Sequence, residues 1–129
     1  MPNMITGTPK KKKAFISGPM RGIPDWNAPM FEYAEKTYTS LGYEVFNPSW
    51  MKFGEGWDVN SIFAIDIAAL AQCDCIIMLP GWEKSEGATL EHDYAKKTGK
   101  EFLYLSTPVK QEDIDNYLYH GIIPESTGG

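Results

Sequence analysis

The chain has 129 residues, of which 43% are hydrophobic and 22% are charged, and its formal net charge is −5. This length fits a single compact domain with one active site and excludes a second independent core. The negative charge argues against binding to duplex nucleic acid, which needs a broad basic surface. No apolar run reaches the roughly 18 residues that cross a bilayer, so no membrane association is expected.

The chain is predicted to begin with a flexible, basic segment, residues 1–12, that has no secretory apolar core. A cytoplasmic location follows as an expectation. Residues 13–17 form a short apolar run that stops at Gly18-Pro19, which is typical of a buried strand followed by a loop.

A helix is predicted for residues 27–41, because apolar side chains recur there at three- and four-residue spacing. Asn27 is expected to cap its start, and Gly42 to end it. Residues 43–46 are rich in aromatic and β-branched side chains and predict a second strand.

An aromatic, glycine-rich loop follows, and it includes Trp57, which we interpret as part of a lid that stacks on a base. Asp58 or Asn60 can cap a second helix that continues to Leu70 and is apolar enough to be mostly buried. Residues 75–79 predict the third strand.

The third helix is predicted for residues 85–98, with Ser85 as its N-cap and Gly99 directly after its end. A fourth strand at residues 102–105 and a fourth helix at residues 111–119 follow. Residues 121–129 are expected to be a flexible tail.

Strands that alternate with helices predict an α/β fold: a single-domain, flavodoxin-like or Rossmann-like parallel sheet of four to five strands, with helices on both faces, over residues 13–120. Such folds bind ligands beyond the carboxyl ends of their strands. Three loops should therefore surround the site, at residues 18–27, 47–57 and 80–85.

The start of the third helix is a candidate phosphate site, because Ser85 and the amides near Gly87 would offer hydrogen-bond donors at the positive end of the helix dipole. Ser85 could equally be no more than a helix cap. In the first loop, Arg21 could pair with a phosphate, while Gly18 and Gly22 would allow the backbone to approach a ligand closely.

Two carboxylates could carry chemistry. Asp66 stands alone in an apolar helix, where burial should raise its pKa and suit it to proton transfer, although a structural aspartate is an equal alternative. Glu91 lies six residues beyond Ser85 on the same helix, near the expected sugar of a nucleotide. Its alternative is a solvated glutamate on a charged helix face.

Three motifs, taken in order and spacing, resemble the nucleoside 2-deoxyribosyltransferase superfamily. They are Phe15-Ile16-Ser17-Gly18-Pro19-Met20-Arg21-Gly22, then Asp66 followed by Asp74, then Ser85-Glu86-Gly87-Ala88-Thr89-Leu90-Glu91. Within the superfamily the chain is most similar to the small deoxynucleoside 5'-monophosphate N-glycosidases, over roughly residues 13–105. Pro19 stands where those hydrolases carry a serine, and Phe15 where many members have a tyrosine.

The resemblance implies hydrolysis of the N-glycosidic bond of a (deoxy)nucleoside 5'-monophosphate, with release of the free base and the sugar phosphate. Glu91 would be the nucleophile, Asp66 would handle the proton of the leaving base, and Ser85 would bind the phosphate. The other substrate-binding residues are expected to be Gly18, Pro19, Met20, Arg21, Gly22, Trp57 and Gly87.

The resemblance also implies a homodimer or larger homo-oligomer, for which the segment after Pro108 is the candidate contact, and no metal or organic cofactor. Three other functions stay open at the level of sequence. They are a nucleoside 2-deoxyribosyltransferase that exchanges bases, a glycohydrolase acting on a dinucleotide, and a non-catalytic nucleotide-binding or sensor domain.

Overall fold

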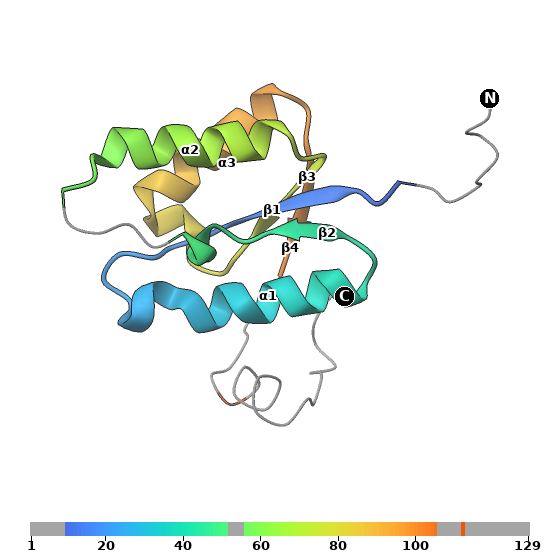
Figure 1. Cartoon of the computed structure of the whole chain (residues 1–129), viewed down its shortest axis with the longest axis horizontal. Helices are drawn as coiled ribbons and strands as arrows, with labels where there is room; N and C mark the ends of the chain where they lie inside the picture. Colours follow the sequence, from blue (N-terminus) through green and yellow to red (C-terminus); the bar gives the residue numbers. More distant parts are fainter. Residues whose placement is uncertain (1–9, 52–55, 106–111, 113–129) are drawn as a thin grey trace.

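A computed structural model describes residues 10–51, 56–105 and 112 of the chain, and it contains one parallel sheet with the strand order β2-β1-β3-β4 (Figure 1). The strands are β1 (Lys13–Ser17), β2 (Glu44–Phe46), β3 (Cys75–Met78) and β4 (Glu101–Tyr104). All three neighbouring strand pairs are parallel. The α/β class predicted from the sequence is confirmed, with four strands in the described part of the chain.

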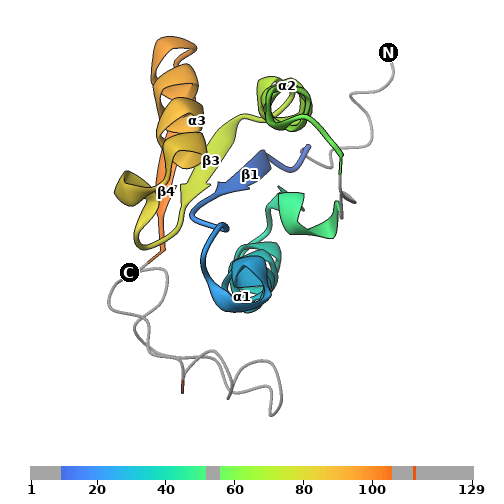
Figure 2. The ribbon, with the colours of Figure 1, turned by 90° about the vertical axis from the view of Figure 1, so that its left-hand side faces the viewer.

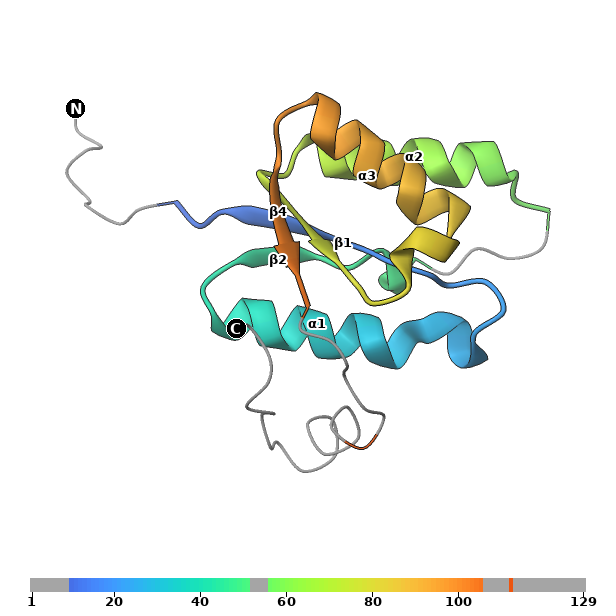
Figure 3. The ribbon, with the colours of Figure 1, turned by 180° about the vertical axis from the view of Figure 1, so that it is seen from behind.

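Helices cover both faces of the sheet, as Figure 2 shows: α1 (Ala28–Ser40) lies on one face, and α2 (Val59–Ala71) and α3 (Glu86–Lys97) lie on the other. Short 3-10 turns at Pro24–Asn27, Pro48–Trp50 and Trp82–Lys84 follow the first three strands. Seen from behind, α2 and α3 lie beside one another above the sheet (Figure 3), and they are in contact.

The two central strands form the core, because their side chains alternate between the faces of the sheet. Ala14, Ile16 and Ile77 pack on the α1 face, whereas Phe15 and Ile76 pack on the face covered by α2 and α3. Ser17 follows Phe15 by two residues and therefore points to the α2 and α3 face. This alternation decides which side chains at the end of β1 can reach α3.

Three of the predicted helix ends are confirmed in detail. The Asp58 carboxylate accepts a hydrogen bond from the Ser61 amide at 3.2 Å and caps α2. Gly42 and Gly99 follow the ends of α1 and α3 with φ of 101° and 73°, a conformation that favours glycine.

The predicted side-chain cap at Asn27 is wrong. A capping residue normally has extended backbone, so that its side chain reaches the amides of the first turn, but Asn27 is left-handed with φ of 63°. Its Nδ2 instead donates a hydrogen bond to the carbonyl of Pro19 at 2.8 Å. The residue thus ties the start of α1 to the loop after β1.

The expectation that α2 would be mostly buried is also wrong. Leu70 is the fully buried residue of this helix, while the side chains of Val59 and Ile65 are 52% and 37% exposed. The reason is geometric: α2 packs against β1 and α3 along one side, and its other side, also apolar, faces outward.

The described part of the chain contains no helix that is both long and apolar enough to cross a bilayer. Most of the predicted N-terminal segment 1–12, the predicted helix 111–119 apart from Glu112, and the predicted tail 121–129 lie outside the described residues.

Gly18→Ala is expected to destabilise the fold by about 1–3 kcal/mol, because adding atoms to a packed site forces its neighbours to move. A Cβ at this position would lie 2.6 Å from Leu79 Cβ. Urea denaturation measures the loss. Gly87→Ala is the matched control: its Cβ would meet nothing within 4 Å, so stability should stay constant or rise. Equal effects of the two substitutions would contradict the steric explanation.

Candidate active site

Glu91 is a buried side chain held by the central sheet, with only 7% of its surface exposed. The hydroxyl of Ser17, at the end of β1, donates a hydrogen bond to Glu91 Oε1 at 2.6 Å. Ser17 is itself 1% exposed. The alternative that Glu91 is a solvated residue on a charged helix face is therefore excluded.

Asp66 on α2 faces Glu91; the two carboxyl groups share a side-chain hydrogen bond, and their charges interact. Asp66 is partly buried, and its Oδ1 is inaccessible and accepts no hydrogen bond from the described residues. A buried acceptor without a donor costs free energy and calls for a physical explanation. The two candidate carboxylates thus meet at the end of β1, between α2 and α3.

Burial raises the pKa of both carboxyl groups, that of Asp66 to about 6 and that of Glu91 to about 8. The hydrogen bond from Ser17 opposes this rise at Glu91, whereas the negative charge of Asp66 adds to it. Contact with Glu91 opposes part of the rise at Asp66. Two adjacent buried carboxyl groups do not both ionise readily, so the pair favours a state in which the two groups hold one proton between them.

The start of α3 combines a helix cap with an open surface. Ser85 Oγ accepts a hydrogen bond from the Ala88 amide at 3.1 Å, which confirms that Ser85 caps the helix. The hydroxyl proton of Ser85 is not used in this bond and can still be donated. Because a Cβ on Gly87 would meet nothing within 4 Å, this turn is accessible to a ligand.

The loops after β1 and β3 are packed against one another at the carboxyl ends of these strands. Leu79 fills the space that a Cβ on Gly18 would need, and Pro19 lies 3.6 Å from the Cβ position of Gly81. Gly18 therefore serves close packing between the two loops.

The remaining candidates in the first loop are one partly buried residue and two exposed ones. Met20 is partly buried and packs against the core cluster on the α1 face, away from Glu91. Arg21 and Gly22 are exposed, and Gly22 has φ of 79°. Within the described residues, the guanidinium of Arg21 makes no hydrogen bond or ion pair and is available to an anion.

The aromatic loop after β2 is anchored at its first residues. Glu35 Oε1 accepts hydrogen bonds from Asn47 Nδ2 at 3.1 Å and from Trp50 Nε1 at 3.2 Å. Trp57, directly before α2, is 54% exposed. Residues 52–55 lie outside the described residues, so the predicted lid is described only at its two ends.

Two features of this region do not follow from the sequence patterns. Ser17 was not among the candidate residues, although alternation along β1 places it on the face of α3. Asp25, Trp26 and Asn27 form a left-handed turn with φ of 56°, 52° and 63°. Such a turn is uncommon for three residues that are not glycine, and no sequence pattern predicted it.

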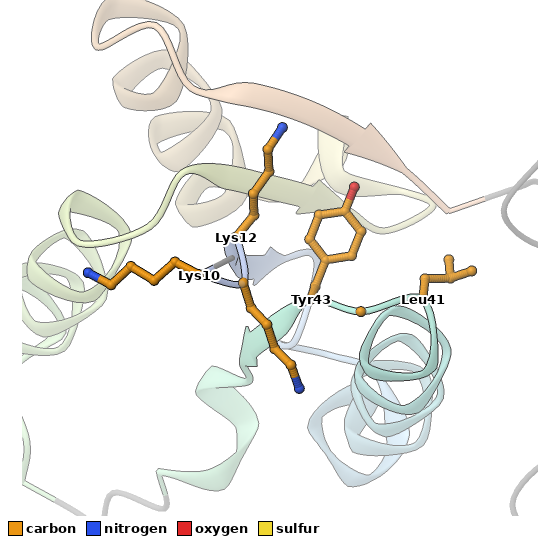
Figure 4. A pocket seen from close by; sticks show the side chains of 6 residues that line it. Lys10, Lys12, Leu41 and Tyr43 are labelled. Atoms are coloured by element: carbon orange, nitrogen blue, oxygen red, sulfur yellow. The ribbon is translucent and has the colours of Figure 1, made fainter. Parts of the chain in front are cut away.

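A hollow of about 350 Å³ is lined by Lys10, Lys11, Lys12, Leu41, Gly42 and Tyr43 (Figure 4). It lies at the amino end of β1, at the opposite end of the strand from Ser17. One of its charges is neutralised, since Lys12 Nζ lies 3.0 Å from Glu101 Oε1. The hollow is separate from the carboxylate pair.

Across the described residues there is no cluster of three or more potential metal ligands.

The fold and site define a class of protein: a parallel α/β domain with a buried carboxylate pair at the carboxyl end of its first strand. The chain matches the family model described as Domain of unknown function (DUF4406) over residues 5–104. Because this match spans most of the sequence, the chain belongs to that family. None of the curated proteins matches the chain.

Glu91→Gln is expected to stabilise the protein increasingly as the pH rises from about 5 to 8. The pKa of Glu91 is raised in the folded state, so the folded state binds this proton more tightly than the unfolded chain, and stability is lost as the pH rises through that range. The gain should reach at least about 1 kcal/mol, the equivalent of one pKa unit.

Urea denaturation of both proteins across this pH range measures the difference. Glu86→Gln removes the same charge from an exposed position of α3 and serves as the control. A stability difference for Glu91→Gln that does not change with pH would show that the carboxyl group is not destabilised by burial.

Proposed function

We propose that this protein hydrolyses the N-glycosidic bond of a (deoxy)nucleoside 5'-monophosphate and releases the free base and the sugar phosphate. The observation that carries the proposal is the buried pair of Glu91 and Asp66, with Glu91 held by Ser17. Retaining glycosidic cleavage uses two carboxyl groups in different protonation states, one as nucleophile and one as acid. A pair that shares one proton meets this requirement.

Glycosyl transfer begins with the proton of the pair. In the reactive form of the pair this proton lies on Asp66, so that Glu91 is a carboxylate and Asp66 is an acid. A Glu91 oxygen then bonds to the anomeric carbon while the bond from that carbon to the base nitrogen breaks. Asp66 gives its proton to the departing base, so that no strongly basic anion has to leave.

Hydrolysis restores the pair. Water attacks the anomeric carbon of the glycosyl-enzyme, Asp66 accepts a proton from the water, and Glu91 leaves as a carboxylate. The proton on Asp66 is again the one proton shared by the two groups. The proposed reaction needs neither a metal nor an organic cofactor, because the carboxyl groups supply both the nucleophile and the acid.

The start of α3 supports a monophosphate as the substrate. The Ser85 hydroxyl, the exposed backbone at Gly87 and the helix dipole all favour an anion, and Glu91 lies on the same helix. Arg21 supplies a cation in the loop after β1. Trp57 is proposed to stack on the base from the aromatic loop.

We further propose that the protein forms a homodimer or larger homo-oligomer in the cytoplasm. The outward side of α2 carries Val59 and Ile65, and α3 on the same sheet face carries Leu90, which is 47% exposed. Exposed apolar helix faces of this kind are typical of contacts between subunits. The segment after Pro108 lies outside the described residues.

Both cysteines are free and buried, which fits a reducing compartment.

A panel of nucleosides, nucleoside monophosphates and dinucleotides, with chromatography of the freed base, tests the activity. Base release is expected from monophosphates in preference to nucleosides. Glu91→Ala should lower kcat by about 100-fold or more, because it removes the nucleophile, while calorimetry should still detect nucleotide binding.

The same panel distinguishes the other functions. A new nucleoside formed on addition of a free base would identify a transferase. Nucleotide binding without base release from any substrate would contradict the proposal and favour a non-catalytic nucleotide-binding domain. Unchanged turnover by Glu91→Ala would exclude Glu91 as the nucleophile.

Ile65→Glu is expected to shift the protein toward the monomer, because it places a charge on the outward side of α2. Light scattering after size-exclusion chromatography measures the mass. Glu83→Gln, at an exposed position in the turn before α3, is the control and should leave the mass unchanged. A strictly monomeric wild-type protein with full activity would contradict the proposed assembly.

A further inference from the structure

We propose that Ser17 is a positioning residue for this reaction, which orients the Glu91 carboxylate and stabilises its ionised form. The inference rests on the proposed function and adds to it a residue that does not touch the substrate. It is carried by the buried hydrogen bond from Ser17 Oγ to Glu91 Oε1, whose length is 2.6 Å. Bonds of this length are typical of a hydroxyl that donates to a charged oxygen.

Ser17 is held rigidly by the sheet. It is the last residue of β1, it is paired with Met78 in β3, and its carbonyl accepts a hydrogen bond from the Leu79 amide at 2.8 Å. Its hydroxyl therefore has a fixed position relative to the strand ends. A donor on a central strand is a more precise support for a reacting group than a donor on a loop.

Within the described residues the Glu91 carboxyl group takes part in two side-chain hydrogen bonds, one donated by Ser17 and one shared with Asp66. Asp66 on α2 is the titratable group whose charge acts on Glu91, and it disfavours ionisation. The neighbouring residues Phe15 and Met78 on the same sheet face are apolar. Burial and the charge of Asp66 both disfavour the ionised form of Glu91. The Ser17 hydroxyl is the contact that favours it.

The geometry also assigns different tasks to the two oxygens of Glu91. Ser17 holds Oε1 and thereby fixes the rotation of the carboxylate. Oε2 is the oxygen that Ser17 does not hold, and in the proposed reaction it bonds to the anomeric carbon. Orientation of this kind increases the rate of attack without increasing the affinity for substrate.

Ser17→Ala is expected to lower kcat by about tenfold to a hundredfold, the equivalent of a lost hydrogen bond to a charged group, with little change in KM. The alkaline limb of the pH profile should move to higher pH, because Glu91 then releases its proton less readily. In protein labelled with ¹³C at glutamate carboxyl groups, the titration midpoint of Glu91 should rise by about one pH unit. Glu91→Gln assigns the signal.

Ser17→Cys keeps a weaker donor at the same place and should give values between those of the parent and Ser17→Ala. Ser40→Ala is the matched control: its hydroxyl donates to the Thr37 carbonyl at 2.8 Å on α1, on the opposite face of the sheet. It should change neither kcat nor the titration of Glu91.

Two results would overturn the inference: an unchanged Glu91 titration in Ser17→Ala, or a loss of activity confined to KM. Failure of the proposed function looks different. In that case the wild-type protein releases no base from any nucleotide, while the titration midpoint of Glu91 still rises in Ser17→Ala. The titration needs no substrate and decides the effect of Ser17 on ionisation by itself.

Discussion

The burial of two carboxyl groups side by side is the constraint on which the arrangement of this molecule depends. Carboxylates lose hydration when they are buried, and a second negative charge nearby increases the cost. The fold supplies a compensating contact at Glu91, the hydroxyl of Ser17 on the central strand. One proton held between the two carboxyl groups lowers the cost further, because it removes one of the two negative charges. A site of this kind reduces the stability of the fold.

Close packing between neighbouring strand ends places this pair. Ser17 is followed at once by Gly18, and the absence of a side chain there lets Leu79 pack against the backbone of the first loop. Pro19 then meets the loop that leads to α3. As a result, the loop after β1 packs against the loop that leads to α3. The Ser17–Glu91 hydrogen bond then connects β1 to α3 itself.

Sequence patterns located the elements well, because local signals define them. Apolar alternation and spacing predicted all four described strands and the three described helices, and Asp58, Ser85, Gly42 and Gly99 mark helix ends as expected. The patterns failed where a residue's surroundings come from distant parts of the chain. Asn27 looked like a helix cap but binds the Pro19 carbonyl, and α2 looked buried although one of its sides faces outward.

The candidate site shows the same division. The sequence by itself determined that carboxylates stand at positions 66 and 91 and that Ser85 caps the helix that carries Glu91, and it predicted a site at the strand ends of a parallel α/β fold. Only the tertiary structure decided that Glu91 is buried against Asp66, that Ser17 donates to it, and that Met20 packs on the other face. The physical reason is that spacing along a chain fixes which face of its own element a side chain occupies. The burial, protonation and partners of that side chain depend on elements brought beside it by folding, here a strand 74 residues away.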